Sequence, residues 1–474
     1  MLFNSFVFFI FLGIILPIFY SLPSKNSKNL FLLISSYFFY GYWDWRFCSL
    51  LAISTIIDFL VGRQLFKTIN IRRRKQLLII SLFSNLGILG FFKYFNFFID
   101  TFQNIFEGFG SNIDYLHMNI LLPVGISFYT FQTLSYTIDI YRKRLEPTNN
   151  FIDFALFVAF FPQLVAGPIE RASALIPQLS KKLKPNRIQI NQGIVLIISG
   201  LFRKVMIGDT AGRFSDQIFG NLEIYKSVEI ISALILFSIQ IYADFSGYSH
   251  IARGTAKLLG VELMKNFEQP YLSRNITEFW RRWHISLSSW LKDYLYISLG
   301  GNRKGKNSTY VNLMITMLLG GLWHGASWNF VIWGGLHGLY LGIHKLTLGN
   351  RKISTEKMNI ISIKNILNVL ITYFLVLFTW LFFRSTTWAS TQLFFNKVIH
   401  WEASEYTLLF TSIVFSYAII TILLDILEYV SDRHTYILKI RSKGIIIGVL
   451  LAMLIVTFIY MFQADPLPFI YFQF

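Results

Sequence analysis

Long apolar runs separated by short polar loops are the dominant pattern along this chain. Such runs occupy residues 2–20, 30–62, 76–99, 120–141, 190–206, 229–245, 310–344, 365–383, 406–430 and 444–462. Each is long enough to cross a hydrocarbon core about 30 Å thick, and the run at 30–62 is long enough for a helical hairpin. Because backbone groups in lipid must bond within their own segment, the pattern predicts an all-α polytopic membrane protein with about eleven transmembrane helices.

Two shorter apolar runs differ from the others. Residues 151–166 contain Pro162, and residues 279–299 are interspersed with charged side chains. Neither suits a simple span that faces lipid, so we interpret both as re-entrant or interfacial elements.

The charges of the loops predict the orientation of the chain. Loops at 63–75, 142–144, 181–187, 253–306, 345–364 and 433–443 are rich in Lys and Arg. By the positive-inside rule, these loops face the cytoplasm. Residues 100–119 contain acidic side chains but no Lys or Arg, and residues 385–405 are nearly free of positive charge, so both face outward. Both termini, including the tail at 463–474, are then extracytoplasmic.

The composition agrees with a lipid environment. The chain is 54% hydrophobic and only 14% charged, which excludes an ordinary soluble globule. The net charge of +18 lies in the short loops, so membrane topology explains it better than nucleic-acid binding does. The single cysteine, Cys48, excludes an intramolecular disulfide and a cysteine-based metal site. No Lys or Arg precedes Lys25, so we expect the first run to be a retained helix rather than a secretory signal. We expect one membrane domain over residues 1–474.

His324 lies inside the run at 310–344, between Trp323 and Gly325. An ionisable side chain at membrane depth is costly, so it indicates a functional site. At the helical rise, His324 lies roughly 20 Å from the preceding basic loop, beyond the midplane of a core about 30 Å thick. A general base at that depth favours a reaction whose two substrates arrive from opposite faces. The structural alternative is a buried histidine that bonds a backbone carbonyl.

The same run carries further glycines and histidines. The glycines recur largely at four-residue spacing, at Gly321, Gly325, Gly334, Gly338 and Gly342. Small residues let helices approach closely, so we interpret the glycines as packing positions. His337 and His344 lie seven residues apart near the predicted cytoplasmic end, where structural roles are expected.

A second informative stretch, residues 275–296, reads NITEFWRRWHISLSSWLKDYLY. It interleaves aromatic residues with charges and contains His284. One interpretation is an interfacial amphipathic helix with aromatic anchors and snorkelling cations. The other is that Arg281 and Arg282 hold an anionic cofactor while His284 borders its acyl thioester.

The usual signatures of soluble enzymes are missing from the sequence. There is no G-x-x-x-x-G-K-[ST], no G-x-G-x-x-G after a strand, no G-x-S-x-G and no H-E-x-x-H. ATP-driven transport and zinc hydrolysis therefore lose support, and we expect no metal.

Five blocks between residues 120 and 345 match a known family. They are PVGISFYTFQTLSYTIDIYR (123–142), FPQLVAGPIE (161–170), QIYADFSGYS (240–249), NFEQPYLSRNITEFWRRWHISLSSWLKDYLYISLGGNR (266–303) and residues 319–338. The chain thereby resembles the membrane-bound O-acyltransferase (MBOAT) superfamily, in particular its bacterial branch with the alginate O-acetyltransferase membrane subunit. One departure is His250, where this branch more often has an acidic residue.

The resemblance implies a helical bundle around a central tunnel, with a catalytic core over about 120–345. It implies that His324 is the catalytic histidine and His284 the second characteristic polar position. The residues that would border the donor are Arg281, Arg282, Trp283 and Trp323. The implied donor is cytoplasmic acetyl-CoA, whose acetyl group crosses the inner membrane to modify a cell-envelope polysaccharide such as alginate-like exopolysaccharide or peptidoglycan. An extracytoplasmic SGNH-type acetyltransferase is the implied partner.

The end of the chain, FIYFQF at 469–474, is similar to the terminal motif of a small protein that works with the related D-alanyl transferase, where a tyrosine is an acyl relay. We therefore hypothesise that Tyr471 enters the outer mouth of the tunnel and carries acetyl from the donor near His324 to the partner. The alternative is an aromatic anchor at the membrane surface.

Two other functions compete with acetyl transfer. D-alanyl transfer to teichoic acid is a variant within the family, but LGGNRKGK at 299–306 looks like the alginate-type branch. A transporter that moves an acyl donor or glycan without making bonds would also place a polar group in a helical bundle.

Overall fold

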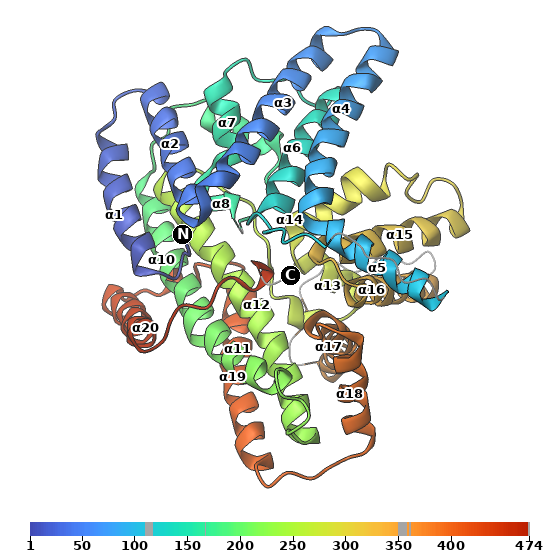
Figure 1. Cartoon of the computed structure of the whole chain (residues 1–474). Helices are drawn as coiled ribbons and strands as arrows, with labels where there is room; N and C mark the ends of the chain where they lie inside the picture. Colours follow the sequence, from blue (N-terminus) through green and yellow to red (C-terminus); the bar gives the residue numbers. More distant parts are fainter. Residues whose placement is uncertain (110–116, 166, 349–357, 360–361, 473–474) are drawn as a thin grey trace. The chain divides into compact units, whose positions relative to one another are not determined.

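The computed structural model describes residues 1–109, 117–165, 167–348, 358–359 and 362–472, and every regular element in these ranges is a helix (Figure 1). The predicted all-α class is confirmed. Six segments are long and apolar enough to cross a membrane: Lys25–Lys67, Ile71–Gly108, Ser227–Leu258, Ile363–Arg384, Thr407–Ser431 and Lys443–Gln463. Two shorter apolar helices, Phe6–Ser21 and Phe151–Leu164, accompany them. The chain is therefore a multi-pass membrane protein.

These six segments are not a count of single helices, because Lys25–Lys67 alone contains two long helices, Lys25–Asp44 and Cys48–Lys67. The number of about eleven transmembrane helices stays a prediction. The run at 310–344 is not among the six segments; it contains Asn312, His324 and Asn329 and is interrupted after His324.

The described residues form two compact units. The first comprises residues 1–193 and 255–264, and the second comprises residues 194–254 and 265–474. The boundaries fall inside helices α10 (Arg187–Leu201) and α12 (Ser227–Leu258), so both units contain parts of them.

The first unit is built around α6 (Ile126–Tyr141), which is buried along almost its whole length. Its other helices are α1 (Phe6–Ser21), α2 (Lys25–Asp44), α3 (Cys48–Lys67), α4 (Ile71–Leu89), α5 (Phe95–Gly108), α7 (Phe151–Ala159), α8 (Phe161–Leu164) and α9 (Ala172–Leu179). The run predicted as a possible hairpin at 30–62 is indeed two helices, α2 and α3. The run at 151–166 is two short helices, in keeping with its predicted irregularity.

Buried polar side chains tie α3, α4 and α6 together. The Asp58 carboxylate accepts hydrogen bonds from Ser81 at 2.5 Å and from the Asn85 amide at 2.8 Å. The Ser81 hydroxyl also lies 3.0 Å from that of Thr137. Polar groups in an apolar surrounding must be satisfied in this way, so the network specifies how the three helices pack.

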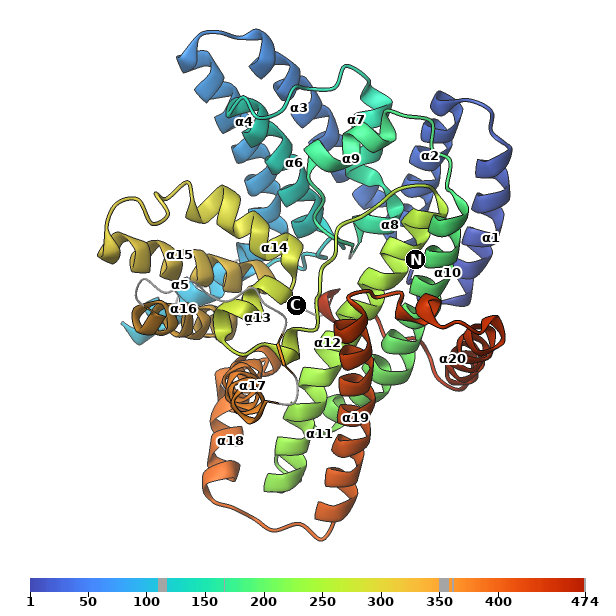
Figure 2. The same cartoon turned by 180° about the vertical axis from the view of Figure 1, so that it is seen from behind.

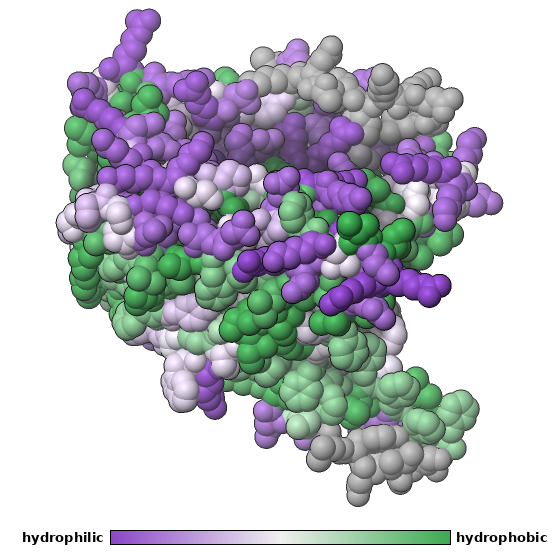
Figure 3. Space-filling model, turned by 90° about the horizontal axis from the view of Figure 1, so that it is seen from above, coloured by the Kyte–Doolittle hydropathy of each residue, from purple (hydrophilic) through white to green (hydrophobic). Residues whose placement is uncertain are grey.

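The second unit contains the remaining helices, α11 to α20. They are α11 (Thr210–Phe219), α12, α13 (Ile276–Arg282), α14 (Ile285–Trp290), α15 (Lys306–His324), α16 (Trp328–Leu348), α17 (Ile363–Arg384), α18 (Trp388–Ile399), α19 (Thr407–Ser431) and α20 (Lys443–Gln463). Helix α12 is mostly buried and forms the centre of the unit, whereas α19 and α20 expose most of their apolar side chains. Apolar side chains also gather in contiguous green areas on the face seen in Figure 3. Such surfaces suit contact with lipid.

The run at 310–344 is a helical hairpin rather than one continuous helix. Helix α15 ends at His324 and α16 begins at Trp328, and the two pack antiparallel. Glycines make this approach possible: a Cβ on Gly321 would lie 2.1 Å from the Phe330 carbonyl oxygen. The expectation of a histidine within a single span is thus corrected, because His324 lies at a helix end.

Substitution of Gly334 should test the hairpin packing. A Cβ at Gly334 would lie 2.3 Å from the Met317 carbonyl oxygen, so Gly334→Ala must push the two backbones apart. We expect the variant to lose about 1–3 kcal/mol of stability, the usual range for overpacking, measured as thermal unfolding in detergent. The matched control is Gly448→Ala in α20, where nothing lies within 4 Å of the added carbon. Equal melting temperatures for the two variants would contradict tight packing at Gly334.

Candidate active site

His324 is the last residue of α15, and the chain turns into an extended conformation at Gly325. Its ring is buried and surrounded by aromatic rings. The ring centroids of Trp323, Trp333 and Phe383 lie 5.1, 4.9 and 5.3 Å from it. These three rings exclude water from the imidazole. Electrostatic interactions with His324 are therefore stronger than they would be in water.

His284 lies at a break between two short helices. Helix α13 ends at Arg282 and α14 starts at Ile285, and His284 is the N-cap of α14 in the left-handed conformation, at φ 39°. Non-glycine residues rarely adopt this conformation, and those that do cluster at functional sites. A residue outside both helices stabilises the break, because the Ile285 N–H donates a 2.8 Å hydrogen bond to the Asn266 carbonyl.

Burial determines the protonation of His284. The side chain is fully buried, and desolvation lowers its pKa to about 3. The imidazole is therefore neutral near pH 7. A neutral imidazole has one nitrogen that donates a hydrogen bond and one that accepts.

The aromatic residues of 275–296 are part of the core of the second unit. Phe279, Trp280, Trp283 and Trp290 are all buried. The alternative of an interfacial helix with aromatic anchors is therefore wrong for this segment, because these rings pack against protein. The Trp283 ring, for example, lies 5.0 Å from that of Trp380.

Tyr471 is brought next to both histidines by the C-terminal segment. In Figures 1 and 2, the red segment after α20 returns to α12, where the C-terminus is labelled. The Tyr471 ring centroid lies 5.4 Å from that of His324 and 6.4 Å from that of His284. Rings of Phe245 and Phe469 flank it at 4.7 and 5.3 Å. Gln473 and Phe474, also part of the predicted terminal motif, lie outside the described residues.

The Tyr471 hydroxyl is buried, and within the described part of the chain no group forms a hydrogen bond with it. A buried polar atom without a partner is rare and usually belongs to a functional site. Burial, together with the nearby Asp244, raises the pKa of Tyr471 above its ordinary value. The hydroxyl thus stays protonated and needs a base before it can act as a nucleophile.

The two arginines predicted to hold a cofactor have different surroundings. Arg281 is exposed to solvent. Arg282 forms an ion pair with Glu278 at 2.7 Å, and its guanidinium lies 5.3 Å from the Tyr429 ring. Two tryptophans were also predicted to border the donor. Trp283 is buried in the core of the second unit, and the Trp323 ring lies 5.8 Å from that of His284 and 5.1 Å from that of His324.

His337 and His344 have the structural roles expected for them. His337 accepts a hydrogen bond from the Trp280 indole at 3.2 Å, and its other ring nitrogen lies 3.0 Å from the Thr379 hydroxyl. His344 pairs with the Thr277 hydroxyl at 2.7 Å. Both therefore connect α16 to its neighbours.

Several residues at the site were missed from the sequence. Trp333, Phe383 and Phe245 complete the aromatic enclosure, but nothing in the sequence distinguishes them from other core aromatics. Lys204 and Asp244 approach the C-terminal segment, and a signal for them did exist. Both are ionisable residues in apolar runs, the same criterion that singled out His324.

Comparison with known proteins gives three kinds of relative. The family model of membrane-bound O-acyltransferases matches residues 142–388. The chain is 41% identical over 411 residues to the probable alginate O-acetylase of Pseudomonas aeruginosa, covering 85% of this chain and 76% of that protein. It is 37% identical over 390 residues to the peptidoglycan O-acetyltransferase of Helicobacter pylori, covering 76% and 72%. The teichoic acid D-alanyltransferase of Streptococcus thermophilus is 28% identical over 257 residues, covering 49% and 59%.

Proposed function

Since this chain belongs to the membrane-bound O-acyltransferase family, as its resemblance predicted, we propose that it transfers acetyl from acetyl-CoA to Tyr471, for onward transfer to a cell-envelope polysaccharide. The observation that carries the proposal is the buried hydroxyl of Tyr471, on a ring 5.4 Å from His324. A nucleophile and a base in this proximity are the two groups that acyl transfer from a thioester requires.

The first step forms an ester on Tyr471. His324 takes the proton of the hydroxyl while the phenolic oxygen attacks the thioester carbonyl of the donor. The carbon–sulfur bond then breaks, and the CoA thiolate takes the proton from His324. The products are O-acetyl-Tyr471 and free CoA thiol, and His324 returns to its neutral form.

His284, whose ring lies 6.4 Å from that of Tyr471, assists this step. Its neutral imidazole offers one N–H, which can donate a hydrogen bond to the carbonyl oxygen as that oxygen becomes negative. The left-handed backbone at His284 supports this role, because it holds the ring in a fixed direction.

The second step passes acetyl to an acceptor outside the cytoplasm. A phenyl ester is a reactive acyl donor, because phenolate is a better leaving group than the alkoxide of a sugar. We propose an SGNH-type extracytoplasmic acetyltransferase as the protein that receives acetyl from Tyr471. The relatives that act on alginate and on peptidoglycan support a polysaccharide as the final acceptor. Their higher identity and coverage favour acetyl over D-alanyl as the acyl group.

The loop charges support a cytoplasmic donor. The loops that flank the hairpin are basic, which by the positive-inside rule favours a CoA side in the cytoplasm and both termini outside the bacterial inner membrane. Arg281 is exposed and is the available cation for the phosphates of CoA, whereas Glu278 already neutralises Arg282. His324 and Tyr471 would then meet the thioester inside a tunnel open to both faces.

The ester itself is the direct test of this proposal. We expect purified protein incubated with acetyl-CoA to gain one acetyl group on the C-terminal peptide, detected by mass spectrometry after rapid acid quenching. Hydroxylamine should remove the group, because it cleaves oxygen esters but not amides. The same incubation with Tyr471→Phe is the control. An acetylated tail in that variant, or acetyl found only on other residues, would refute Tyr471 as the carrier.

A further inference from the structure

We propose that Lys204, Asp209 and Asp244 form a clamp that grips the backbone of the C-terminal segment and sets the register in which Tyr471 faces His324. The clamp is defined by these three residues. The inference rests on the proposed function of Tyr471, but the clamp itself can be tested without enzymatic activity.

The clamp is one buried cation shared by two buried carboxylates. The Lys204 ammonium lies 2.5 Å from Asp209 and 2.9 Å from Oδ1 of Asp244. Two carboxylates around one ammonium leave an excess of acceptors. Taking such charges out of water is costly unless every remaining lone pair finds a donor.

The backbone of the C-terminal segment supplies one of these donors. The Ile470 N–H donates a 2.8 Å hydrogen bond to Oδ2 of Asp244, whereas Oδ1 pairs with Lys204. The Lys204 ammonium donates to the Pro468 carbonyl at 3.5 Å. The clamp thus contacts the backbone on both sides of Phe469.

The Phe469 side chain completes the docking. It is fully buried, and its ring lies 4.8 Å from Tyr248 and 5.1 Å from Phe245, both on α12. Backbone contacts at 468 and 470 together with this ring determine which residue follows beside the histidines. A slip by one residue would bring Ile470 or Phe472 next to His324, and neither has a hydroxyl.

Local backbone geometry builds the clamp. Lys204 and Asp209 lie on η3 (Phe202–Asp209), a π-helical segment that follows α10. Such segments are rare and occur mostly at functional sites. Glycines bring η3 close to α12, since a Cβ on Gly208 would lie 3.0 Å from the Asp244 nitrogen and one on Gly247 would lie 2.8 Å from the Lys204 nitrogen. Because the two helices lie so close, Lys204 on η3 and Asp244 on α12 can both contact the C-terminal segment.

Lys204 and Asp244 are positioning residues, because they contact the tail and not the reacting atoms. Removing Asp244 should therefore free the segment. We expect Asp244→Ala to raise the rate at which a cysteine placed at Phe472 reacts with a maleimide in detergent. The increase should be roughly tenfold or more, the effect of one lost hydrogen bond to a charged group. Cys48→Ser in the same protein leaves the new thiol as the single cysteine.

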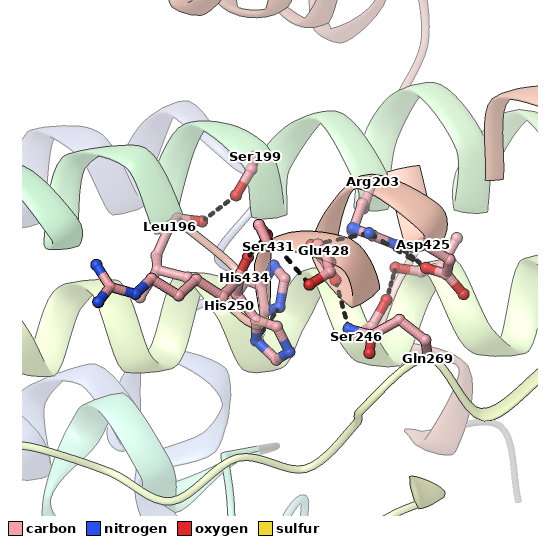
Figure 4. A network of polar contacts seen from close by, with 12 residues as sticks. Leu196, Ser199, Arg203, Ser246, His250, Gln269, Asp425, Glu428, Ser431 and His434 are labelled. Atoms are coloured by element: carbon pink, nitrogen blue, oxygen red, sulfur yellow. Dashed lines mark hydrogen bonds and ion pairs between the residues drawn. The ribbon is translucent and has the colours of Figure 1, made fainter. Parts of the chain in front are cut away.

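The chain offers a matched control in the neighbouring network of Figure 4. Arg203 is buried and shared by two carboxylates, lying 3.4 Å from Asp425 and 3.0 Å from Glu428. Asp425→Ala therefore also removes one of two carboxylates from a buried cation, but no tail contact. The labelling rate of this control should equal that of the protein that carries only Cys48→Ser and Phe472→Cys. Equal rates in Asp244→Ala and Asp425→Ala would overturn the clamp.

A second variant covers the case in which Asp244→Ala does not fold. Asp244→Asn keeps an oxygen that can accept from Ile470, and it is compared with Asp425→Asn. We expect the cysteine in Asp244→Asn to be labelled faster than in Asp425→Asn. It should be labelled more slowly than in an undocked tail. The reference for an undocked tail is the Cys48→Ser, Phe472→Cys protein in denaturant. A labelling rate equal to that of Asp425→Asn would count against the clamp.

Acetyl transfer measured on the same variants separates this inference from the proposed function. If Asp244→Ala exposes the tail while transfer continues at the normal rate, the clamp stands and the relay through Tyr471 fails. If transfer falls while labelling does not change, the clamp fails and the relay stands. In a Tyr471→Phe background, Asp244→Ala should still speed labelling but should lower transfer no further.

Discussion

Replacing His324 by alanine should lower the rate of acetyl transfer from acetyl-CoA by roughly 10²- to 10⁴-fold, the usual contribution of a general base. Of the two histidine rings beside Tyr471, that of His324 is the nearer, at 5.4 Å against 6.4 Å between ring centroids. The hydroxyl does not ionise by itself, because burial raises its pKa. The measurement is incorporation of labelled acetyl by membranes or proteoliposomes that contain equal amounts of protein. Binding of CoA should be nearly unchanged, since the group proposed to hold its phosphates is Arg281 and not the imidazole.

His337→Ala is the matched control for this experiment. His337 is a buried histidine on the same hairpin, but its ring nitrogens are engaged by Trp280 and Thr379. Its loss should lower the melting temperature, because buried partners lose their hydrogen bonds, and should leave the transfer rate of the folded protein within a few-fold. If His324→Ala transferred acetyl at the normal rate, His324 would not be the general base of the reaction.

Tyr471→Phe should abolish polysaccharide acetylation in cells as completely as His324→Ala. The change removes one oxygen atom and keeps the ring, so contacts with Phe245 and Phe469 remain and the tail stays docked. Because the removed hydroxyl forms no hydrogen bond with any described residue, its loss should not lower the melting temperature. The expected result is thus a folded, docked and inactive protein, measured as acetyl ester content of the isolated polysaccharide.

Tyr373→Phe controls for the loss of a buried tyrosine hydroxyl in the same unit. That hydroxyl pairs with Ser238 at 2.7 Å, away from the histidines. The variant should retain polysaccharide acetylation and lose a little stability. Normal acetylation in Tyr471→Phe would instead make the tail an aromatic anchor, the alternative that the sequence left open.

The sequence by itself determined the class of this protein and, without the family resemblance, singled out one residue of its candidate site. Apolar runs in lipid have few structural options, so periodicity and length were sufficient for an all-α membrane protein. The same energetic argument identified His324, because an ionisable group in an apolar run must have a reason to be there. Applied to Lys204 and Asp244, that argument would have found two of the three residues of the proposed clamp, though not their contact with the tail.

Tertiary structure decided everything that depends on residues far apart in the chain. Hydropathy cannot show that the run at 310–344 turns back at His324, because the turn is made possible by glycine packing between α15 and α16. Nor can it show that Ile470 bonds Asp244, which is 226 residues away. Such long-range contacts also bury His284 and hold its left-handed backbone. They place the ring of Tyr471 beside the rings of His284 and His324. The free energy of each of these contacts depends on a partner residue that is distant in the sequence, so no local stretch of sequence can predict it.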